Sequence, residues 1–173
     1  MGRYRPPQPA GSKYITAKGH ERLKQEHDYL WKKKRPEVTR ILSAAAAEGD
    51  RSENAEYIYR KKELREIDSR IRFLRKRLDN MVVVDRIPTD TNKVYFGAWV
   101  TIEDSSGSEK TYRVVGPDEI DPKLGYISMD SPMGKALLGQ TLDAEISIKL
   151  VTGNGPQKTS YIINEINYYP DID

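Results

Sequence analysis

The residues best suited to chemistry lie close together in the stretch AAAAEGDRSENAEY, which holds four carboxylates and a single basic side chain, Arg51. Asp50 and Glu53 are three residues apart, a spacing at which both side chains can point the same way on a helix. Hard cations such as Mg²⁺ prefer oxygen ligands that water or phosphate can complete. Two carboxylates cannot hold Mg²⁺ tightly alone, but they can complete a metal site whose other half belongs to a partner. Glu48 and Glu56 concentrate the negative field.

A purely structural interpretation fits the same residues. Asp50 followed three residues later by Glu53 matches a capping box, and carboxylates in a first helical turn complement the helix dipole. Ser52 or Asp50 can then start the following helix, after Gly49 lets the chain reverse. Spacing alone favours capping, yet capping needs only one or two of these side chains, so both interpretations stay open.

Basic side chains follow the acidic stretch. Between residues 56 and 79 nine basic side chains face five acidic ones, a net charge of +4. The basic residues are Arg60, Lys61, Lys62, Arg65, Arg70, Arg72, Arg75, Lys76 and Arg77. Much of this charge is typical of the solvated face of a coiled coil. The residues nearest the acidic stretch can also hold the phosphate backbone of RNA or DNA.

Two long helices must position the acidic stretch. We expect the first to begin at an N-cap, Thr16, and to run to about Glu48 with a bend at Pro36. Its apolar positions are Leu23, Leu30, Val38, Ile41 and Ala45. We expect the second over Ser52 to Met81, with the three- and four-residue spacing of a coiled-coil seam at Leu64, Ile67, Ile71, Leu74, Leu78 and Met81. About three residues around Gly49 separate the two, which predicts an antiparallel hairpin with the acids at its tip.

From Val82 onward the pattern changes to β-branched runs. We expect strands in MVVVDRI, VYFGAWVTIED, KTYRVVG, GYISMD, AEISIKLV and TSYIINEINYY, with one short helix near 133–138. The fold class is therefore α+β: an N-terminal antiparallel coiled-coil hairpin followed by a mostly antiparallel β domain with one short helix. The domains are a flexible arm over 1–13, a coiled coil over 14–84 with its acidic tip at 48–56, and a β domain over 85–173.

Composition narrows the class of protein further. The 173 residues include no cysteine and two histidines, His20 and His27, so thiolate chemistry is excluded and a histidine metal site is not expected. No run approaches the roughly 20 apolar residues that cross a bilayer, so we expect a soluble cytoplasmic protein that does not contact membranes. The β domain shows no catalytic constellation, since Asp118, Glu119 and Asp121 are typical turn residues.

Several motifs in order resemble the Gre transcript cleavage factors of bacteria, specifically the GreB branch. They are YITAKGHERLKQEHDYLWKKKRPEVTR, EGDRSENAEY and KKELREIDSRIRFL in the first half, and VYFGAWVTIED, YRVVGPDEI and YISMDSPMGKALLG in the second. The resemblance runs from about Tyr14 to about Tyr168, with a weaker match from Leu142 to Lys158. It implies that the β domain is FKBP-like.

The resemblance also implies an activity and a partner. Gre factors insert their coiled coil through the secondary channel of RNA polymerase, where two tip acids help hold the second Mg²⁺ and orient the water that cuts backtracked RNA. The matching acids are Asp50 and Glu53. Such a factor is not itself an enzyme, because the polymerase active site cuts the RNA. Its partners are bacterial RNA polymerase and the 3′ end of the backtracked nascent RNA, and we expect it to act as a monomer.

Further residues follow from the same resemblance. Lys61 matches a basic position near the RNA, and Arg60 and Arg65 extend that patch. Asp130, Ser131 and Pro132 match the loop that contacts the polymerase at the channel rim. Glu48 departs from the family pattern, which usually has an uncharged residue there.

Two alternatives use the same fold with a different function. One is a channel-binding transcription regulator without cleavage activity, which the presence of both Asp50 and Glu53 disfavours. The other is a peptidyl-prolyl isomerase, suggested only by an FKBP-like fold. Isomerase sites are normally lined by aromatic side chains, and the β domain has one Trp, Trp99, and one Phe, Phe96.

Overall fold

The computed structural model describes residues 11–47, 54–152 and 155–169, with side chains described except at 150–157. The chain divides into two compact units. The first, the hairpin unit, is Lys18–Met81, and the second, the sheet unit, combines Met1–Ala17 with Val82–Asp173. The sheet unit therefore takes in residues 14–17 and 82–84, which the sequence groups with the coiled coil, because two short strands from these segments pair with each other.

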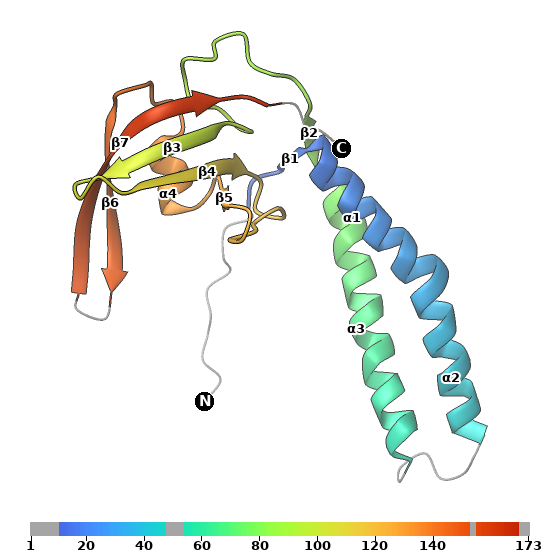
Figure 1. Ribbon diagram of the computed structural model, residues 1–173. Helices are drawn as coiled ribbons and strands as arrows, with labels where there is room; N and C mark the ends of the chain where they lie inside the picture. Colours follow the sequence, from blue (N-terminus) through green and yellow to red (C-terminus); the bar gives the residue numbers. More distant parts are fainter. Residues whose placement is uncertain (1–10, 48–53, 153–154, 170–173) are drawn as a thin grey trace. The chain divides into compact units, whose positions relative to one another are not determined.

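The hairpin unit consists of one helical segment in three parts and a second, longer helix (Figure 1). The first segment comprises α1 (Ala17–Tyr29), a π-helical turn (Leu30–Lys34) and α2 (Arg35–Ala47). The second is α3 (Ala55–Leu78), whose 24 residues extend about 36 Å at 1.5 Å each. Both expected helices are confirmed, but α3 begins at Ala55 and not at Ser52.

The π-helical turn lies directly before Pro36. Proline lacks an N–H and its ring collides with the carbonyl four residues earlier, which disturbs the α-helical hydrogen bonds around it. The Arg35 N–H instead donates to the carbonyl of Leu30, five residues back, while Arg35 keeps right-handed helical angles. The helix continues through the proline as expected, and the disturbance takes the form of a π turn.

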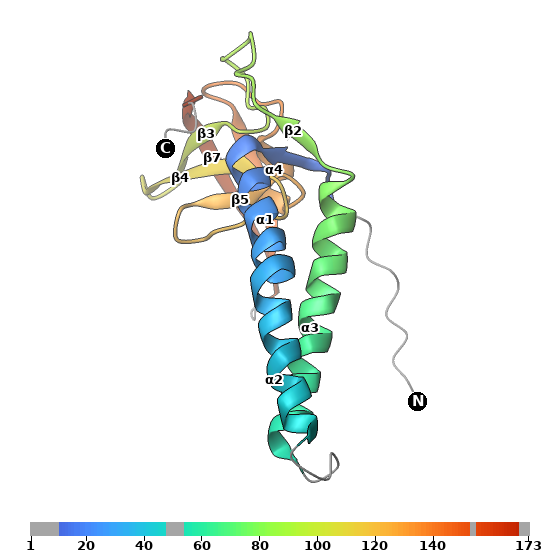
Figure 2. The same ribbon diagram turned by 90° about the vertical axis from the view of Figure 1, so that its right-hand side faces the viewer.

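The two helical segments pack antiparallel. Val38, Ile67 and Ile71 form the buried core between them, with Leu30 and Leu64 packed against it. Polar contacts across the pair join Asn54 to Ala45, Glu63 to Lys34, Asp68 to Arg35 and Arg70 to Glu26. Residue numbers rise along one helix as they fall along the other, so the predicted antiparallel pairing is confirmed, and Figure 2 shows α1 and α2 beside α3.

The sheet unit contains a two-stranded pair and a five-stranded sheet. The pair is β1 (Tyr14–Thr16) and β2 (Val82–Val84), which run parallel. The sheet has the order β5-β4-β3-β7-β6. Its strands are β3 (Trp99–Asp104), β4 (Glu109–Val115), β5 (Tyr126–Ser128), β6 (Glu145–Thr152) and β7 (Gly155–Asn167). Only β4 and β5 pair parallel within it, so the mostly antiparallel sheet expected from the sequence is confirmed.

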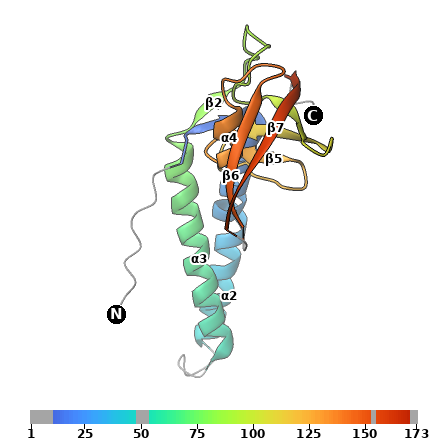
Figure 3. The ribbon, with the colours of Figure 1, turned by 90° about the vertical axis from the view of Figure 1, so that its left-hand side faces the viewer.

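The core of the sheet unit lies between the sheet and its one short helix, α4 (Pro132–Leu137). Its buried residues are Val94, Ala98, Val100, Ile102, Val114, Leu137, Ile146 and Ile163. Figure 3 shows the long strands β6 and β7 side by side. The helix lies within one residue of its expected position because Ser131 caps it and Pro132 occupies its first turn, a position that tolerates a missing N–H.

The last residues of the expected arm are anchored. The N–H of Ser12 donates to Asp130 over 2.7 Å and its hydroxyl donates to the other carboxylate oxygen. The carbonyl of Lys13 accepts from the N–H of Val82. The flexible arm predicted over 1–13 is therefore wrong for residues 11–13, because strand pairing at Tyr14 brings them against the sheet unit. Residues 1–10 lie outside the described residues.

Glu119 is a turn residue, as expected, but it is also buried, with only 3% of its surface exposed. Its carboxylate accepts hydrogen bonds from the N–H and hydroxyl of Thr16 and from the N–H of Gly116. Thr16 therefore directs its hydroxyl to Glu119, 103 residues away along the chain. A Cβ on Gly116 would lie 2.2 Å from the carbonyl oxygen of Tyr14, so this close approach requires glycine.

None of the helices in the described parts of the chain combines the length and the apolar character needed to cross a membrane.

Candidate functional site at the end of the helical hairpin

The acids of the predicted metal site, Asp50 and Glu53, and the neighbouring Glu48 lie outside the described residues. Their proposed roles therefore remain predictions. Among the described residues, no three His, Asp or Glu side chains gather in a way that could hold a metal ion. His27 contacts Asp28, with 3.3 Å between Nδ1 and Oδ1.

Asn54 caps the helix that follows the acidic stretch. Its Oδ1 accepts from the N–H of Tyr57 over 3.0 Å, and its extended backbone angles are those of an N-cap residue. The expectation that Ser52 or Asp50 starts this helix is wrong, because Asn54 is its N-cap, accepts from the first-turn N–H of Tyr57, and is followed directly by α3. Asparagine is among the preferred N-cap residues, so its type was the signal that could have identified it.

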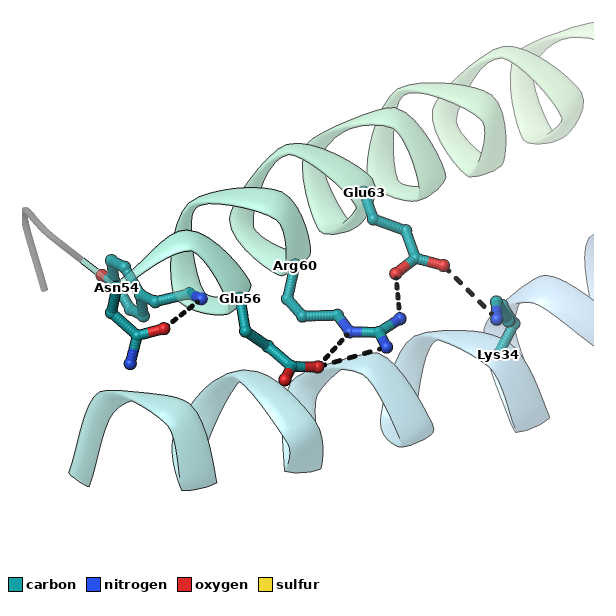
Figure 4. Close-up of polar contacts among 6 residues, drawn as sticks. Lys34, Asn54, Glu56, Arg60 and Glu63 are labelled. Atoms are coloured by element: carbon teal, nitrogen blue, oxygen red, sulfur yellow. Dashed lines mark hydrogen bonds and ion pairs between the residues drawn. The ribbon is translucent and has the colours of Figure 1, made fainter. Parts of the chain in front are cut away.

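Arg60 is held by two acids of its own helix. Its guanidinium donates to Glu56 over 3.3 Å and to Glu63 over 2.9 Å. Glu63 also forms an ion pair with Lys34 of the π turn, 3.3 Å away, as Figure 4 shows. The hydrogen bond from Arg60, followed by that from Lys34, lowers the pKa of Glu63 below its ordinary value of 4.5. Arg60 thus links α3 to the first helical segment through Glu63, and its charge is largely neutralised.

Lys61 and Arg65 present their charge differently. Both residues are exposed, and within the described parts of the chain neither forms an ion pair. The ammonium of Lys61 lies 5.5 Å from the centre of the Tyr57 ring, an arrangement that orients the side chain without neutralising it. Three residues are predicted to bind RNA. Lys61 and Arg65 have charges that can bind a phosphate, whereas the guanidinium of Arg60 binds Glu56 and Glu63 within the hairpin.

The second group of predicted site residues lies in the sheet unit, at the start of α4. Ser131 accepts from the Gly134 N–H over 3.0 Å and donates to the Ser128 carbonyl over 2.6 Å. Asp130 is partly buried, and both of its carboxylate oxygens accept from Ser12. Pro132 is exposed. The three residues therefore form one ordered turn, in which Pro132 offers the freest surface.

A cavity of about 310 Å³ lies elsewhere in the sheet unit. Its lining combines aromatic side chains, Phe96, Tyr168 and Tyr169, with the basic side chains Arg86 and Arg113. Trp99 does not line it, but packs edge-on against Tyr126 with ring centres 5.7 Å apart.

Comparison with known protein families identifies both halves of the chain. Residues 13–83 match the family described as "Transcription elongation factor, N-terminal", and residues 89–168 match "Transcription elongation factor, GreA/GreB, C-term". The boundary between the two matches falls between residues 83 and 89, close to the change of pattern at Val82. These matches define the class of the protein, a transcription elongation factor.

Relatives of similar length make the assignment more specific. Transcription elongation factor GreB of Pseudomonas aeruginosa is 55% identical over 170 residues, covering 98% of this chain and 99% of the relative. GreB of Xanthomonas axonopodis pv. citri is 53% identical, covering 97% and 98%. The chain belongs to the GreA/GreB family of transcription elongation factors.

Solved structures add little to this assignment. The GreA factor homolog 1 (Gfh1) protein of Thermus thermophilus is 29% identical, with 89% of this chain and 97% of that chain covered and a TM-score of 0.40. A score of this size carries no conclusion about a shared arrangement, so the family rests on the sequence matches.

Proposed function

We propose that this protein stimulates the cleavage of backtracked nascent RNA by bacterial RNA polymerase, and so rescues arrested transcription complexes. In this proposal the hairpin unit enters the secondary channel of the polymerase and presents Asp50 and Glu53 to the active site. Family membership supports the class of process, and the resemblance of EGDRSENAEY to the cleavage factors supports the chemistry. The protein is then not an enzyme in its own right, but a supplier of ligands to another enzyme.

The donor set fits the metal that this role requires. Two carboxylates are oxygen ligands of the kind that Mg²⁺ prefers, and the described residues beside them add no thiolate or histidine cluster that would favour a softer metal. The Mg²⁺, shared with the polymerase, would supply Lewis-acid activation of the attacking water. Asp50 and Glu53 would complete its ligands and orient that water, and tight binding to the isolated protein is not expected.

The observation that carries the proposal is the antiparallel pairing of α2 with α3, because Asp50 and Glu53 lie between these two helices in the sequence. α2 ends at Ala47, and α3 begins at Ala55 behind the Asn54 cap. In the proposal, a hairpin of this kind would present Asp50 and Glu53 at the end where its two helices are joined. Lys61 and Arg65 lie in the first three turns behind that end, where an RNA backbone beside the acids would need positive charge.

The turn of Asp130, Ser131 and Pro132 is the proposed contact with the polymerase at the channel rim. The hydrogen bonds of Ser131 order this turn before any partner binds, which lowers the entropy lost on docking. The protein would act in the cytoplasm as a monomer bound to polymerase and RNA, without a membrane partner.

An RNA release assay on purified arrested elongation complexes tests the proposal. Asp50→Asn and Glu53→Gln preserve side-chain size while removing the charge. We expect both variants to bind polymerase like the unchanged protein and to release the RNA 3′ fragment at least about 100-fold more slowly, because each loses a metal ligand. Normal cleavage by the double variant would rule out the metal role. Binding without cleavage by the unchanged protein would favour the regulator alternative.

A further inference from the structure

Asn54 makes two hydrogen bonds in opposite directions at the end of the helical hairpin. Its Oδ1 accepts from the N–H of Tyr57 in its own helix, and its Nδ2 donates to the carbonyl of Ala45 in α2 over 2.9 Å. Tyr57 lies in the first turn of α3, and Ala45 lies in the last described turn of α2. One side chain therefore joins the first turn of α3 to the last described turn of α2.

The chemistry of the two bonds requires an amide. Asparagine carries an acceptor oxygen and a donor nitrogen on one short planar group, whereas an ionised aspartate can only accept and a serine is shorter. Aspartate and serine are good N-caps. Either residue at position 54 would keep the bond to Tyr57 and lose the bond to Ala45. These substitutions therefore remove the bond between the helices while leaving the N-cap of α3 in place.

The bond to Ala45 lies nearer to the acidic stretch along the chain than the ion pairs that cross between the described helices. Of the polar contacts between the helical segments, those of Lys34, Arg35 and Glu26 all lie farther from it along the chain. Fixing both ends of a connecting segment restricts the conformations available to the residues between them. Catalytic groups are sensitive to such restriction, because a misplacement of about 1 Å can cost about 100-fold in rate.

We propose that Asn54 is a positioning residue, which holds the ends of α2 and α3 at a fixed separation and thereby orients the acids between them. The structural part of this statement rests on Asn54, Ala45 and Tyr57 alone. Its consequence for RNA cleavage rests on the proposed function of Asp50 and Glu53.

A distance measurement on the isolated protein tests the structural part. The chain has no cysteine, so cysteines introduced at the exposed positions Ser43 and Ile58 can carry spin labels without further changes. In the unchanged background we expect one narrow distribution of distances between the labels. Asn54→Asp and Asn54→Ser should broaden it while helix content and melting temperature stay unchanged, and an unaltered distribution in both would overturn the proposal.

Asn80 supplies a matched control. Its Nδ2 donates to the carbonyl of Lys76 over 2.8 Å within the far end of the hairpin unit, so Asn80→Asp removes the same kind of donor without touching a cross-helix contact. We expect this variant to leave the label distances and the cleavage rate unchanged. Broadening of the same size in Asn80→Asp would show that loss of any such donor loosens the hairpin, and would overturn a specific role for Asn54.

Cleavage assays test the functional part. We expect Asn54→Asp and Asn54→Ser to slow RNA release about 10-fold at saturating factor, with unchanged affinity for polymerase, as do residues that orient metal ligands. The Mg²⁺ concentration for half-maximal rate should rise in both. Broadened distances with a normal cleavage rate would overturn the positioning role. If the unchanged protein stimulates no cleavage, the proposed function fails, and the label distances still decide whether Asn54 clamps the helix ends.

Discussion

Glu119 in the sheet unit and Glu63 in the hairpin unit both accept several hydrogen bonds, yet they are held in different ways. Glu119 is 3% exposed and takes its bonds from Thr16 and Gly116, which come from two separate segments. Glu63 has a side chain 19% exposed and is held by the charged ends of Arg60 and Lys34. Glu119 is thus part of the interior of the sheet unit, whereas Glu63 is part of a charged surface of the hairpin unit.

The hydrophobic core of the sheet unit is also larger than that of the hairpin unit. Among the described residues, eight buried residues form the core cluster of the sheet unit, while three form the core cluster between the helices. A narrow hairpin buries little, so nearly all of its charged residues stay accessible to a partner. The proposed chemistry lies in the hairpin unit, and the proposed docking turn lies in the more deeply packed sheet unit. The predictions below test that division.

The largest effect on the free energy of unfolding is expected for Glu119→Ala. The substitution leaves two N–H groups and a hydroxyl without their acceptor, and each buried unsatisfied group costs about 1–3 kcal/mol. We expect the sheet unit to lose about 3–5 kcal/mol of unfolding free energy. Urea unfolding measures this loss when it is followed by Trp99 fluorescence. A Trp31→Phe background leaves Trp99 as the one tryptophan of the chain. The exposed Glu145 supplies the control Glu145→Ala, and equal small effects of both variants would contradict an interior role for Glu119.

A smaller effect is expected for the hairpin core. Ile67 is 7% exposed and Ile58, on the same helix, is 53% exposed. Ile67→Ala should destabilise the hairpin by about 2–3 kcal/mol, since it leaves a cavity, while Ile58→Ala should change stability by no more than about 0.5 kcal/mol. Thermal unfolding followed by helical circular dichroism distinguishes them, and a ranking in the opposite order would refute the core described here.

Substitutions of Lys61 and Arg60 should have different effects on the salt dependence of activity, because only Lys61 is expected to bind RNA. Lys61→Ala removes a charge that forms no ion pair within the described parts of the chain. We therefore expect the salt dependence of the half-maximal factor concentration to weaken by about 0.7 in log–log slope, the value for one phosphate of a single strand. Arg60→Ala breaks internal ion pairs and should leave that slope unchanged. Lys24→Ala, an exposed lysine of α1, serves as the control. Equal slopes for Lys61→Ala and Lys24→Ala would remove the case for an RNA contact at Lys61.

The smallest effect concerns acid stability. Hydrogen bonds from Arg60 lower the pKa of Glu63, and those from Arg70 lower the pKa of Glu26, each below the ordinary 4.5. A carboxylate with a depressed folded-state pKa contributes stability above about pH 4.5, and that stability is lost as the pH falls through the folded-state value. Melting temperatures of Glu63→Gln and the unchanged protein should therefore differ at neutral pH and converge in acid. A difference that persists at low pH would contradict this assignment.

The local pattern of the sequence is sufficient to predict the long helices, the strands from β2 onward and α4, but not β1, whose residues include the expected N-cap Thr16. The seam at Ile67 and Ile71 repeats at helical spacing, and the β-branched run before Asp104 alternates, so both depend on neighbours in the chain. The spacing of apolar residues beyond Pro36 predicts that the helix continues through the proline, which is confirmed. The π turn at Leu30–Lys34 is not predictable in the same way, because it depends on which new partners the disturbed hydrogen bonds find.

The misses share a physical cause, which is contact between residues distant in the sequence. In the sequence, Glu119 has the pattern of an ordinary turn residue. In the fold, the pairing of β1 with β2 places Thr16 beside it, which the local sequence does not indicate. Ser12 was assigned to a flexible arm for the same reason, since its partner Asp130 lies 118 residues away. Asn54 was overlooked because the neighbouring acids matched a capping box, and only the observed start of α3 decides between candidate caps.

A competition experiment on arrested transcription complexes tests the central claim most directly. The Asp50→Asn/Glu53→Gln double variant keeps the hairpin helices and the docking turn but lacks both proposed metal ligands. Added in increasing amounts to complexes with a fixed amount of unchanged protein, it should suppress RNA 3′ fragment release progressively to the rate without factor, because it occupies the same channel without supplying the acids. Release that continues at the full rate while the double variant is bound would contradict the account.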